Sequence, residues 1–196
     1  MDPARLLGRT RPPPTEPSHA ATCPKAVRWL VLTLAWLSAC AGPAARERRV
    51  TVLLFIDPEC PVSNFYAPEM TRLWETYAPR GVAFRGIHSE PVVTAEQAER
   101  HATEFRLGFP VLVDDRQALA RRYEIGKVPT AVVLSAGDTL LYRGRIDDRY
   151  SPDGKRRDEP RTRDLEEAVK AALEGRPPPV AETTPYGCPL NALWKP

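Results

Sequence analysis

The sequence predicts an α/β fold, in which helices pack on both faces of a sheet. One observation behind this prediction is that short apolar segments alternate with segments of helical periodicity after residue 49. A second is that the last two apolar segments, 131–135 and 139–144, are separated only by Ala136-Gly137-Asp138, a sequence typical of a hairpin turn. Alternating strands and helices are typical of α/β sheets, so one domain of this class is expected.

The order of the elements follows from apolar periodicity and from residues typical of helix ends. Thr94 and Gln97 form a capping-box pattern at the start of one helix. Asp164 is expected to cap the final helix, which ends at Gly175. The expected strands are 50–56, 82–88, 110–113, 131–135 and 139–144, and the helices before the final one are expected at 61–78, 95–106 and 116–123.

Charged residues dominate the stretch between the last strand and the final helix. Arginine and aspartate alternate irregularly from Asp147 to Arg163, without apolar periodicity. A stretch of this composition predicts a solvated loop. Asp147 and Asp148, at its start, are therefore expected to be exposed.

Both ends of the chain differ in composition from its centre. The 22 prolines gather near the termini, which leaves one domain of ordinary size between them. Near the N-terminus, Lys25 and Arg28 precede an apolar segment that is too short to span a bilayer but fits the core of a signal peptide. The predicted organisation is a signal peptide at 1–39, a tether at 40–48, the domain at 49–175 and a proline-rich tail with Cys188 at 176–196.

The predicted signal peptide ends in a recognisable pattern. Leu37-Ser38-Ala39-Cys40 resembles the lipobox of bacterial lipoproteins, in which the cysteine carries the lipid. The resemblance implies that Cys40 is lipidated and that the protein is exported to the cell envelope, on the periplasmic face of a membrane. The alternative is a buried apolar segment that ends in cysteine.

The charge of the chain depends on whether this segment is removed. The whole chain has 28 basic and 25 acidic residues, a formal net charge of +3. Residues 1–39 hold five of the basic and two of the acidic residues, so the remainder has a net charge of zero. A nucleic-acid partner therefore has no electrostatic support.

Cys60 is the main candidate for a catalytic residue. The apolar strand 50–56 runs directly into Asp57-Pro58-Glu59-Cys60-Pro61-Val62-Ser63, where a helix is expected to begin. A cysteine in the first turn of a helix lies where backbone N–H groups and the helix dipole stabilise the thiolate. This placement is typical of a reactive thiol.

The residues on either side of Cys60 modify this prediction. Ser63 occupies the position where a dithiol site would have its second cysteine. Its hydroxyl can donate a hydrogen bond to the thiolate, but it cannot attack a mixed disulfide. Glu59 places a carboxylate beside the thiolate and opposes its formation by like-charge repulsion. A second thiol is therefore required from elsewhere.

Several motifs in order along the chain resemble the thioredoxin superfamily, and within it the redoxin branch of exported thiol–disulfide proteins. Ala67 and Pro68 follow Cys60 by the spacing typical of thioredoxins, and Val128-Pro129-Thr130 resembles the cis-proline loop. The segment 109–114 resembles the extra unit of the redoxin branch. The resemblance extends from Val50 to about Leu173.

The resemblance implies a thioredoxin-like fold with a central mixed β-sheet flanked by helices. It implies a cis peptide bond before Pro129, which would place the backbone of Val128 beside Cys60. An extended substrate would then lie along Val128, Pro129 and Thr130. The implied activity is thiol–disulfide exchange on a protein or small-molecule disulfide or thiol, with no cofactor.

Cys188 is a candidate for the second thiol. The proline-rich linker after Gly175 is long enough, at ~3.3 Å per residue, to cross the domain. Cys188 is expected to attack the mixed disulfide that Cys60 forms with a substrate. It does so either in the same chain or on Cys60 of a second copy. The alternative is a tail cysteine with a separate role, such as a metal ligand or a contact with another protein.

A peroxiredoxin-like thiol peroxidase is the competing enzyme. Cys60-Pro61 resembles the peroxidatic motif of peroxiredoxins, and Cys188-Pro189 resembles their resolving tail. In that family a threonine precedes the nucleophile by three residues and a proline precedes it by seven. Asp57 and Leu53 stand at these positions here, which speaks against fast peroxide reduction.

Two further residues have alternative interpretations. His88 ends an apolar strand and is either a packing residue or a third ligand with Cys60 and Cys188 in a metal- or client-binding module without enzymatic activity. The sequence has no paired-cysteine zinc spacing. Asp57 either relays protons to the sulfur or is a turn residue before the helix.

Overall fold

The computed structural model describes residues 50–191 and 193 of the protein. The signal peptide predicted at 1–39, the tether at 40–48 and the lipidation site at Cys40 lie outside the described residues. Within the described part of the chain, no helix is both long and apolar enough to cross a membrane.

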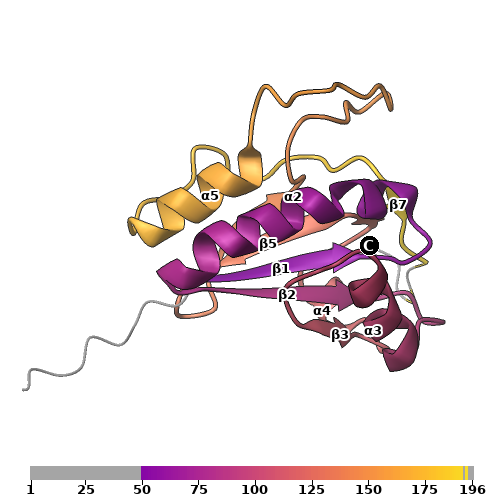
Figure 1. Ribbon diagram of the computed structural model, residues 1–196. Coiled ribbons are helices and arrows are strands. Elements are labelled where there is room, and N and C mark those ends of the chain that lie inside the picture. Colours follow the sequence, from indigo (N-terminus) through magenta and orange to yellow (C-terminus); the bar gives the residue numbers. More distant parts are fainter. Residues whose placement is uncertain (1–49, 192, 194–196) are drawn as a thin grey trace, which may run out of the picture. The chain divides into compact units, whose positions relative to one another are not determined.

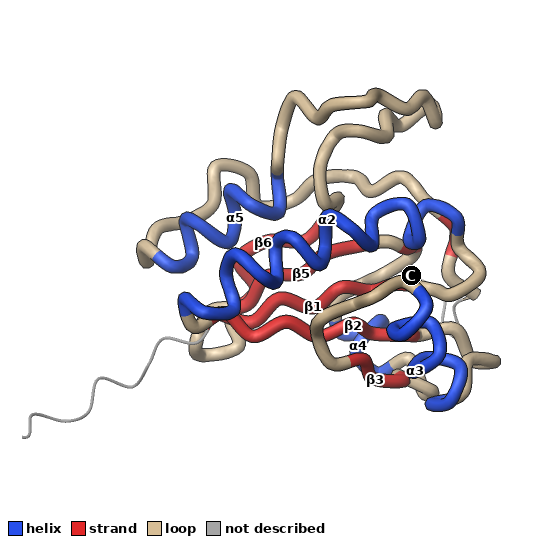
Figure 2. Tube along the Cα trace, viewed as in Figure 1, coloured by secondary structure: helices blue, strands red, loops and turns tan. Residues whose placement is uncertain are grey.

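A five-stranded mixed sheet forms the centre of the domain (Figures 1 and 2). Its strand order is β3-β2-β1-β5-β6, with β1, β2 and β3 parallel and β5 and β6 antiparallel to their neighbours. The α/β class and the central mixed sheet predicted from the sequence are confirmed. The strands are β1 (Val50–Ile56), β2 (Val82–His88), β3 (Val111–Val113), β5 (Thr130–Leu134) and β6 (Leu140–Gly144).

Helices cover both faces of this sheet. The long α2 (Pro61–Tyr77) and α5 (Asp164–Leu173) lie on one face, with α3 (Ala95–Glu104) near the β3 edge, and the short α4 (Ala118–Arg122) lies behind the sheet (Figure 1). The 3₁₀ turn η1 (Ala78–Arg80) follows α2. The capping box predicted at the start of α3 is present, with the side chains of Thr94 and Gln97 each bonded to the other's backbone N–H.

The alternation of side chains along β1 creates two cores. Val52, Leu54 and Ile56 pack under α2 and α5, whereas Leu53 and Phe55 pack on the opposite face with residues of α4. This is the period-2 alternation of a strand that is buried on both faces. The second core also contains Cys60, Val128 and Leu190, so the candidate site and the C-terminal tail share one apolar cluster.

The prediction that Asp164 caps the final helix is wrong. Asp164 is the first helical residue rather than the N-cap, which is Arg163 and makes no side-chain capping bond. The Asp164 carboxylate instead accepts a hydrogen bond from Arg145 Nε at 2.8 Å. The ion pair with Arg145, the residue that follows β6, thus engages the carboxylate oxygen atoms that a capping residue would have offered to the helix N–H groups.

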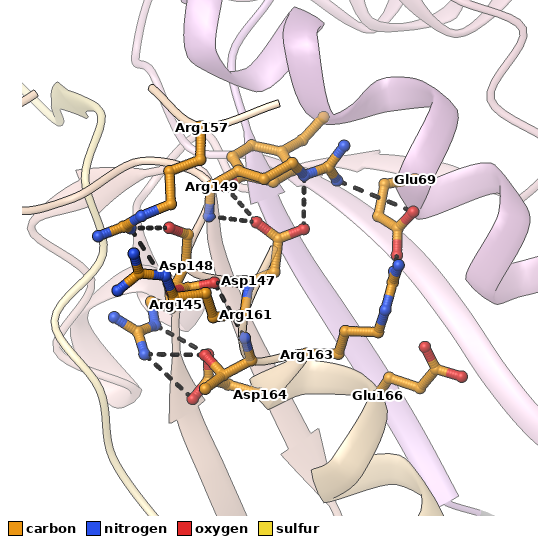
Figure 3. Close-up of polar contacts among 12 residues, drawn as sticks. Glu69, Arg145, Asp147, Asp148, Arg149, Arg157, Arg161, Arg163, Asp164 and Glu166 are labelled. Atoms are coloured by element: carbon orange, nitrogen blue, oxygen red, sulfur yellow. Dashed lines mark hydrogen bonds and ion pairs between the residues drawn. The ribbon is translucent and has the colours of Figure 1, made fainter. Parts of the chain in front are cut away.

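The arginine- and aspartate-rich stretch is not a solvated loop at its start. Asp147 and Asp148 are 2% and 8% exposed, against the prediction of full exposure. Asp147 accepts hydrogen bonds from Tyr66 Oη at 2.7 Å and from Arg149 Nε at 2.7 Å. Figure 3 shows these aspartates beside arginines of the same stretch, and Arg149 forms an ion pair with Glu69 of α2. Asp147 is compensated for its desolvation by Tyr66 of α2 and by Arg149. Asp148 is compensated mainly by the backbone N–H groups of Arg161 and Thr162 in its own stretch.

Candidate active site

Cys60 lies at the junction between β1 and α2, as the sequence predicts. It is the N-cap residue of α2, with extended backbone angles, and Pro61 follows as the first helical residue. The Cys60 side chain is 2% exposed and packs in the second core. The sulfur is therefore held at the positive end of a 17-residue helix and shielded from water.

Asp57 shapes the loop that delivers Cys60. Its Oδ1 accepts a hydrogen bond from the Glu59 N–H at 2.6 Å, and its carbonyl accepts one from the Cys60 N–H at 3.2 Å. Burial raises the pKa of the Asp57 carboxyl, and the nearby charges of Glu90 and Glu59 raise it further. Asp57 acts as a turn residue, and its raised pKa also suits a group that exchanges protons.

Ser63 is enclosed one helical turn after Cys60. The side chain is 1% exposed, and its Oγ accepts a hydrogen bond from the Asp57 N–H at 3.3 Å. Asn64, the next residue, donates to the Pro58 carbonyl at 2.9 Å. Ser63 and Asn64 thus tie the loop 57–60 to the first turn of α2.

The loop before β5 brings its backbone to Cys60. The Val128–Pro129 peptide bond is cis. The carbonyl oxygen of Val128 lies 3.4 Å from Cys60 Sγ, and Thr130 Oγ1 donates a hydrogen bond to the Lys127 carbonyl at 2.7 Å. The structure thereby brings together the cysteine and the three loop residues named from the sequence.

Cys188 of the tail reaches the same place from the far end of the chain. Cys60 and Cys188 are joined in a disulfide that links positions 128 residues apart, with their Cα atoms 6.0 Å from each other. The tail forms the short strand β7 (Cys188–Pro189), which pairs antiparallel with β4 (Lys127–Val128). In this pairing Cys188 is directly opposite Val128.

Sequence reasoning missed the residues that hold the tail after Cys188. Glu90 accepts two hydrogen bonds from Asn191, one from its N–H and one from its side-chain amide, both at 2.9 Å. The side chain of Gln117 donates to the Asn191 carbonyl at 2.9 Å and accepts from the Leu193 N–H at 2.6 Å. Gln117 is fully buried and has a positive φ of 52°. No local pattern marks these residues, because their partners lie 74 to 101 positions away in sequence.

His88 is a packing residue in the structure rather than a third ligand with Cys60 and Cys188. It is fully buried at the end of β2, and its ring lies edge-on to that of His101 with centroids 5.1 Å apart. Burial lowers the pKa of His88 to about 4, and the neighbouring His101 lowers it as well. Among residues 50–191, no group of three or more His, Cys, Asp or Glu side chains is placed to hold a metal ion.

Comparisons with known proteins identify a family and similar solved structures. The AhpC/TSA family matches residues 43–143. An uncharacterised conserved protein from Geobacillus kaustophilus is 32% identical, with 75% of this chain and 78% of that chain covered and a TM-score of 0.64. A hypothetical protein from Sinorhizobium meliloti is 26% identical over 72% of this chain and 78% of that chain, with a TM-score of 0.63.

One further solved structure is similar in fold. A putative thiol:disulfide interchange protein DsbE from Chlorobium tepidum is 18% identical, with 65% of this chain and 82% of that chain covered and a TM-score of 0.51. The domain therefore has a thioredoxin-like fold. No curated protein matches the chain with significance.

Proposed function

The chain belongs to the AhpC/TSA family, and on that premise we propose that it is a thiol–disulfide oxidoreductase in which Cys60 is the nucleophile and Cys188 the resolving thiol. The observation that carries this proposal is the disulfide between these two residues beside the cis peptide bond at Pro129. Two thiols that reach bonding contact from positions 128 residues apart form the minimum machinery for a dithiol–disulfide cycle.

The first step begins with both thiols reduced. The Cys60 thiolate, stabilised at the N-terminus of α2, attacks one sulfur of a substrate disulfide. A mixed disulfide forms between Cys60 and that sulfur, and the second substrate sulfur leaves as a thiolate. The backbone of Val128, 3.4 Å from the Cys60 sulfur, offers an edge along which an extended substrate can lie.

The second step releases the substrate. The Cys188 thiolate attacks Cys60 Sγ, the Cys60–Cys188 disulfide forms, and the first substrate sulfur leaves as a thiolate. The substrate has gained two electrons and the protein has lost two, which an external dithiol must return. Run in reverse, the same steps oxidise a substrate dithiol.

Asp57 and Ser63 have supporting roles in this proposal. Asp57 is a buried acid in the loop that ends at Cys60, and its raised pKa makes it a suitable proton donor to a leaving thiolate. Ser63 holds the backbone of Asp57 in place. Ser63 has no sulfur, so Cys188 does the work that a second cysteine does in a dithiol motif.

The disulfide and the N-terminal sequence both bear on the compartment in which the protein works. A disulfide persists in an oxidising compartment, and the sequence before the domain has the pattern of a lipoprotein signal peptide with Cys40 at its end. We therefore propose that the protein works outside the cytoplasm, attached to a membrane through lipid on Cys40, with proteins or small molecules that carry disulfides as partners.

Two single substitutions test the chemistry. In the reduced protein, Cys60→Ser should slow the reaction with a small aromatic disulfide to the rate of the remaining, ordinary thiols of the chain. Cys188→Ser should retain the first step and stop after one equivalent, with the mixed disulfide on Cys60 detectable by mass spectrometry. Thr76→Ala, at an exposed position near the far end of α2, serves as the control, since it keeps both thiols and lies outside the site. Full turnover by Cys188→Ser would show that Cys188 does not resolve the intermediate.

The AhpC/TSA family match makes peroxide reduction the second candidate. Asp57 stands where the peroxiredoxins have the threonine that positions peroxide, and its carboxylate is already engaged with the Glu59 N–H. Cys60 is therefore expected to react with hydrogen peroxide no faster than a free thiol. Stopped-flow measurement of Cys60 oxidation separates the two activities, since fast oxidation would favour the peroxidase.

A further inference from the structure

The tail occupies the edge along which the substrate of the proposed reaction would lie. Cys188 is opposite Val128 and Pro189 is opposite Lys127 in the antiparallel pair of β7 and β4. The Leu190 N–H continues this pairing with a hydrogen bond to the Gly126 carbonyl at 3.0 Å. The chain thus presents a cysteine in extended backbone to Cys60, as a substrate peptide would have to do.

The position before Cys188 has room only for glycine. A Cβ atom on Gly187 would lie 2.0 Å from the Val128 carbonyl oxygen and 2.7 Å from its carbonyl carbon. Both contacts are with backbone, which cannot move aside without losing the pairing with β7. A peptide that binds in this register must therefore have glycine directly before its cysteine.

The position two residues after Cys188 is selective for an apolar side chain. Leu190 is 7% exposed and belongs to the same buried cluster as Cys60, Ile125 and Val128. Full burial of a leucine side chain contributes about 1.5–3 kcal/mol. An apolar residue at this position therefore adds substantially to binding, whereas a charged residue would be buried without a partner.

Polar groups recognise the backbone beyond this apolar position. Glu90, 7% exposed, accepts both hydrogen bonds that Asn191 donates, and the buried Gln117 bonds to the backbone on either side of residue 192. Gln117 is held by a further bond from its side chain to the Ser89 carbonyl at 2.8 Å. Together with the edge of β4, these groups form a binding site for an extended chain. The site makes separate contacts with the glycine, cysteine, leucine and asparagine positions.

Resting on the proposed function, we infer that this binding site is the substrate-recognition groove of the enzyme and that the tail is an internal copy of the substrate. The groove is defined by Glu90, Gln117, Gly126 and Val128. Its client is an extended protein segment that contains a disulfide-bonded cysteine, with glycine directly before it and an apolar residue two positions after it. The tail and the client compete for one edge of β4.

The competition fits into the two-step exchange. In the reduced protein the tail leaves β4, and the client segment pairs there while Cys60 attacks its disulfide and the second client sulfur departs as a thiolate. Cys188 then attacks Cys60 Sγ, and the client sulfur leaves as a thiolate. As the tail takes back the edge of β4, the client segment is displaced from it. Because the tail is tethered, its effective concentration at the groove is on the order of millimolar, and only a client with matching contacts competes.

Peptides activated at cysteine test the inference. The probe is Tyr-Gly-Cys-Pro-Leu-Asn, with its cysteine in a mixed disulfide with thionitrobenzoate, whose release is followed by absorbance. The full-length protein carries Cys23→Ser, Cys40→Ser and Cys188→Ser, so that Cys60 is its one thiol. It also carries Gly187→Val, so that the clash with Val128 keeps the tail out of the groove. Two comparison peptides replace glycine by valine or leucine by aspartate. The matched peptide should react at least about tenfold faster than either.

Two protein variants add to this test in the same background. Glu90→Gln removes one of the acceptors that face the asparagine position and should slow the matched peptide severalfold. Glu75→Gln, at an exposed position toward the far end of α2, makes the same chemical change and should have no effect. Restoring Gly187 should slow the matched peptide, since the tail then competes. Circular dichroism of each variant verifies that it is folded.

The outcomes separate the inference from the proposed function. Dithionitrobenzoic acid, a small disulfide that makes no groove contacts, should react with Cys60 at equal rates in the background protein and in its Glu75→Gln variant. If it reacts but the three peptides do so at equal rates, the groove does not select its client and the inference is wrong. If it does not react at all, Cys60 is not the nucleophile and the proposed function is overturned instead.

Discussion

At the scale of single residues, the site combines a shielded sulfur with a rigid loop. Cys60 is 2% exposed while it is bonded to Cys188, which is itself partly exposed. In the proposed exchange, we therefore expect an external thiol to attack Cys188, the more exposed of the two residues, and to release Cys60 as the thiolate at the start of α2. Attack at Cys188, with the Cys60 thiolate as the leaving group, is the favourable direction of exchange.

His88 is a polar residue in surroundings that do not satisfy its hydrogen-bonding groups. It is fully buried, and neither of its ring nitrogens has a hydrogen-bond partner. Leaving buried polar atoms unsatisfied costs about 1–3 kcal/mol per group. The ring is accommodated by contact with His101, whose pKa is also lowered by burial.

Replacing His88 tests this environment through the pH dependence of stability. The folded-state pKa of His88 is about 4, below the value of about 6.5 for an unfolded chain. Below pH ~6.5 the unfolded state therefore binds a proton that the folded state does not, and stability falls until the pH reaches ~4. His88→Leu removes this loss. Urea unfolding at each pH measures the free energy of unfolding of both proteins. The difference between the variant and the wild type should grow in favour of the variant by up to about 3 kcal/mol from pH 7.5 to pH 4.

The comparison between the two proteins isolates His88. Carboxylates that titrate in the same range contribute equally to both curves, so only the difference between the curves is interpreted. Parallel curves between pH 7.5 and pH 4 would show that His88 takes up its proton as readily in the folded state as in the unfolded state.

At the scale of elements, the stretch after β6 is joined to α2 by charge. Asp147 accepts hydrogen bonds from Tyr66 of α2 and from Arg149, and Glu69 of α2 accepts one from Arg163 at 3.3 Å (Figure 3). Burial and the hydrogen bond to Asp147 raise the pKa of Tyr66, which keeps its hydroxyl protonated as a donor. This network gives the irregular stretch a defined position without an apolar core of its own.

Asp147→Ala should destabilise the protein by about 3 kcal/mol. The substitution removes the partner of a charged Arg149, which is mostly buried, and of the Tyr66 hydroxyl, and breaking one side of such a pair costs about 3–5 kcal/mol when fully buried. Urea unfolding measures the effect. Asp158→Ala, at an exposed position of the same stretch, is the matched control and should change stability by less than about 0.5 kcal/mol. Equal effects of the two substitutions would contradict the structural role of Asp147.

At the scale of the whole molecule, the tail after α5 contacts β6, the stretch that follows β6, and β4. After α5 it runs beside the edge strand β6, where the Thr183 N–H bonds to the Arg143 carbonyl at 3.0 Å. It then stacks Tyr186 on Tyr150 with ring centroids 5.3 Å apart, before it reaches β4 at Cys188. Figure 1 shows this path in yellow, from α5 to β7.

Reduction of the disulfide should therefore lower global stability. The cross-link joins residues 128 positions apart and restricts the unfolded chain, an effect worth about 2–4 kcal/mol. Urea unfolding of the wild type, with and without a dithiol reductant, measures the loss. Cys188→Ser is the control, because its unfolding should not respond to the reductant. A wild-type midpoint that ignores the reductant would show that the cross-link does not constrain the unfolded state.

The sequence by itself determined the features that depend on neighbouring residues. Apolar periodicity located all the strands of the main sheet within one or two residues, and the Thr94 capping box and the hairpin turn at 136–138 were readable because their partners are close along the chain. The same holds for Cys60 at the start of a helix. Strand periods, caps and turns are local physical properties, so they leave local patterns.

Only the tertiary structure decided what is buried and what meets Cys60. Asp147 and Asp148 look solvated in sequence because charge alone indicates exposure, and only the folded chain supplies the partners that compensate their burial. The groove residues Glu90 and Gln117 leave no signal for the same reason. Cys188 is a candidate from sequence because the site needs a second thiol and the linker after Gly175 can cross the domain. Its place opposite Val128 depends on a chain path of 128 residues, which no local pattern specifies.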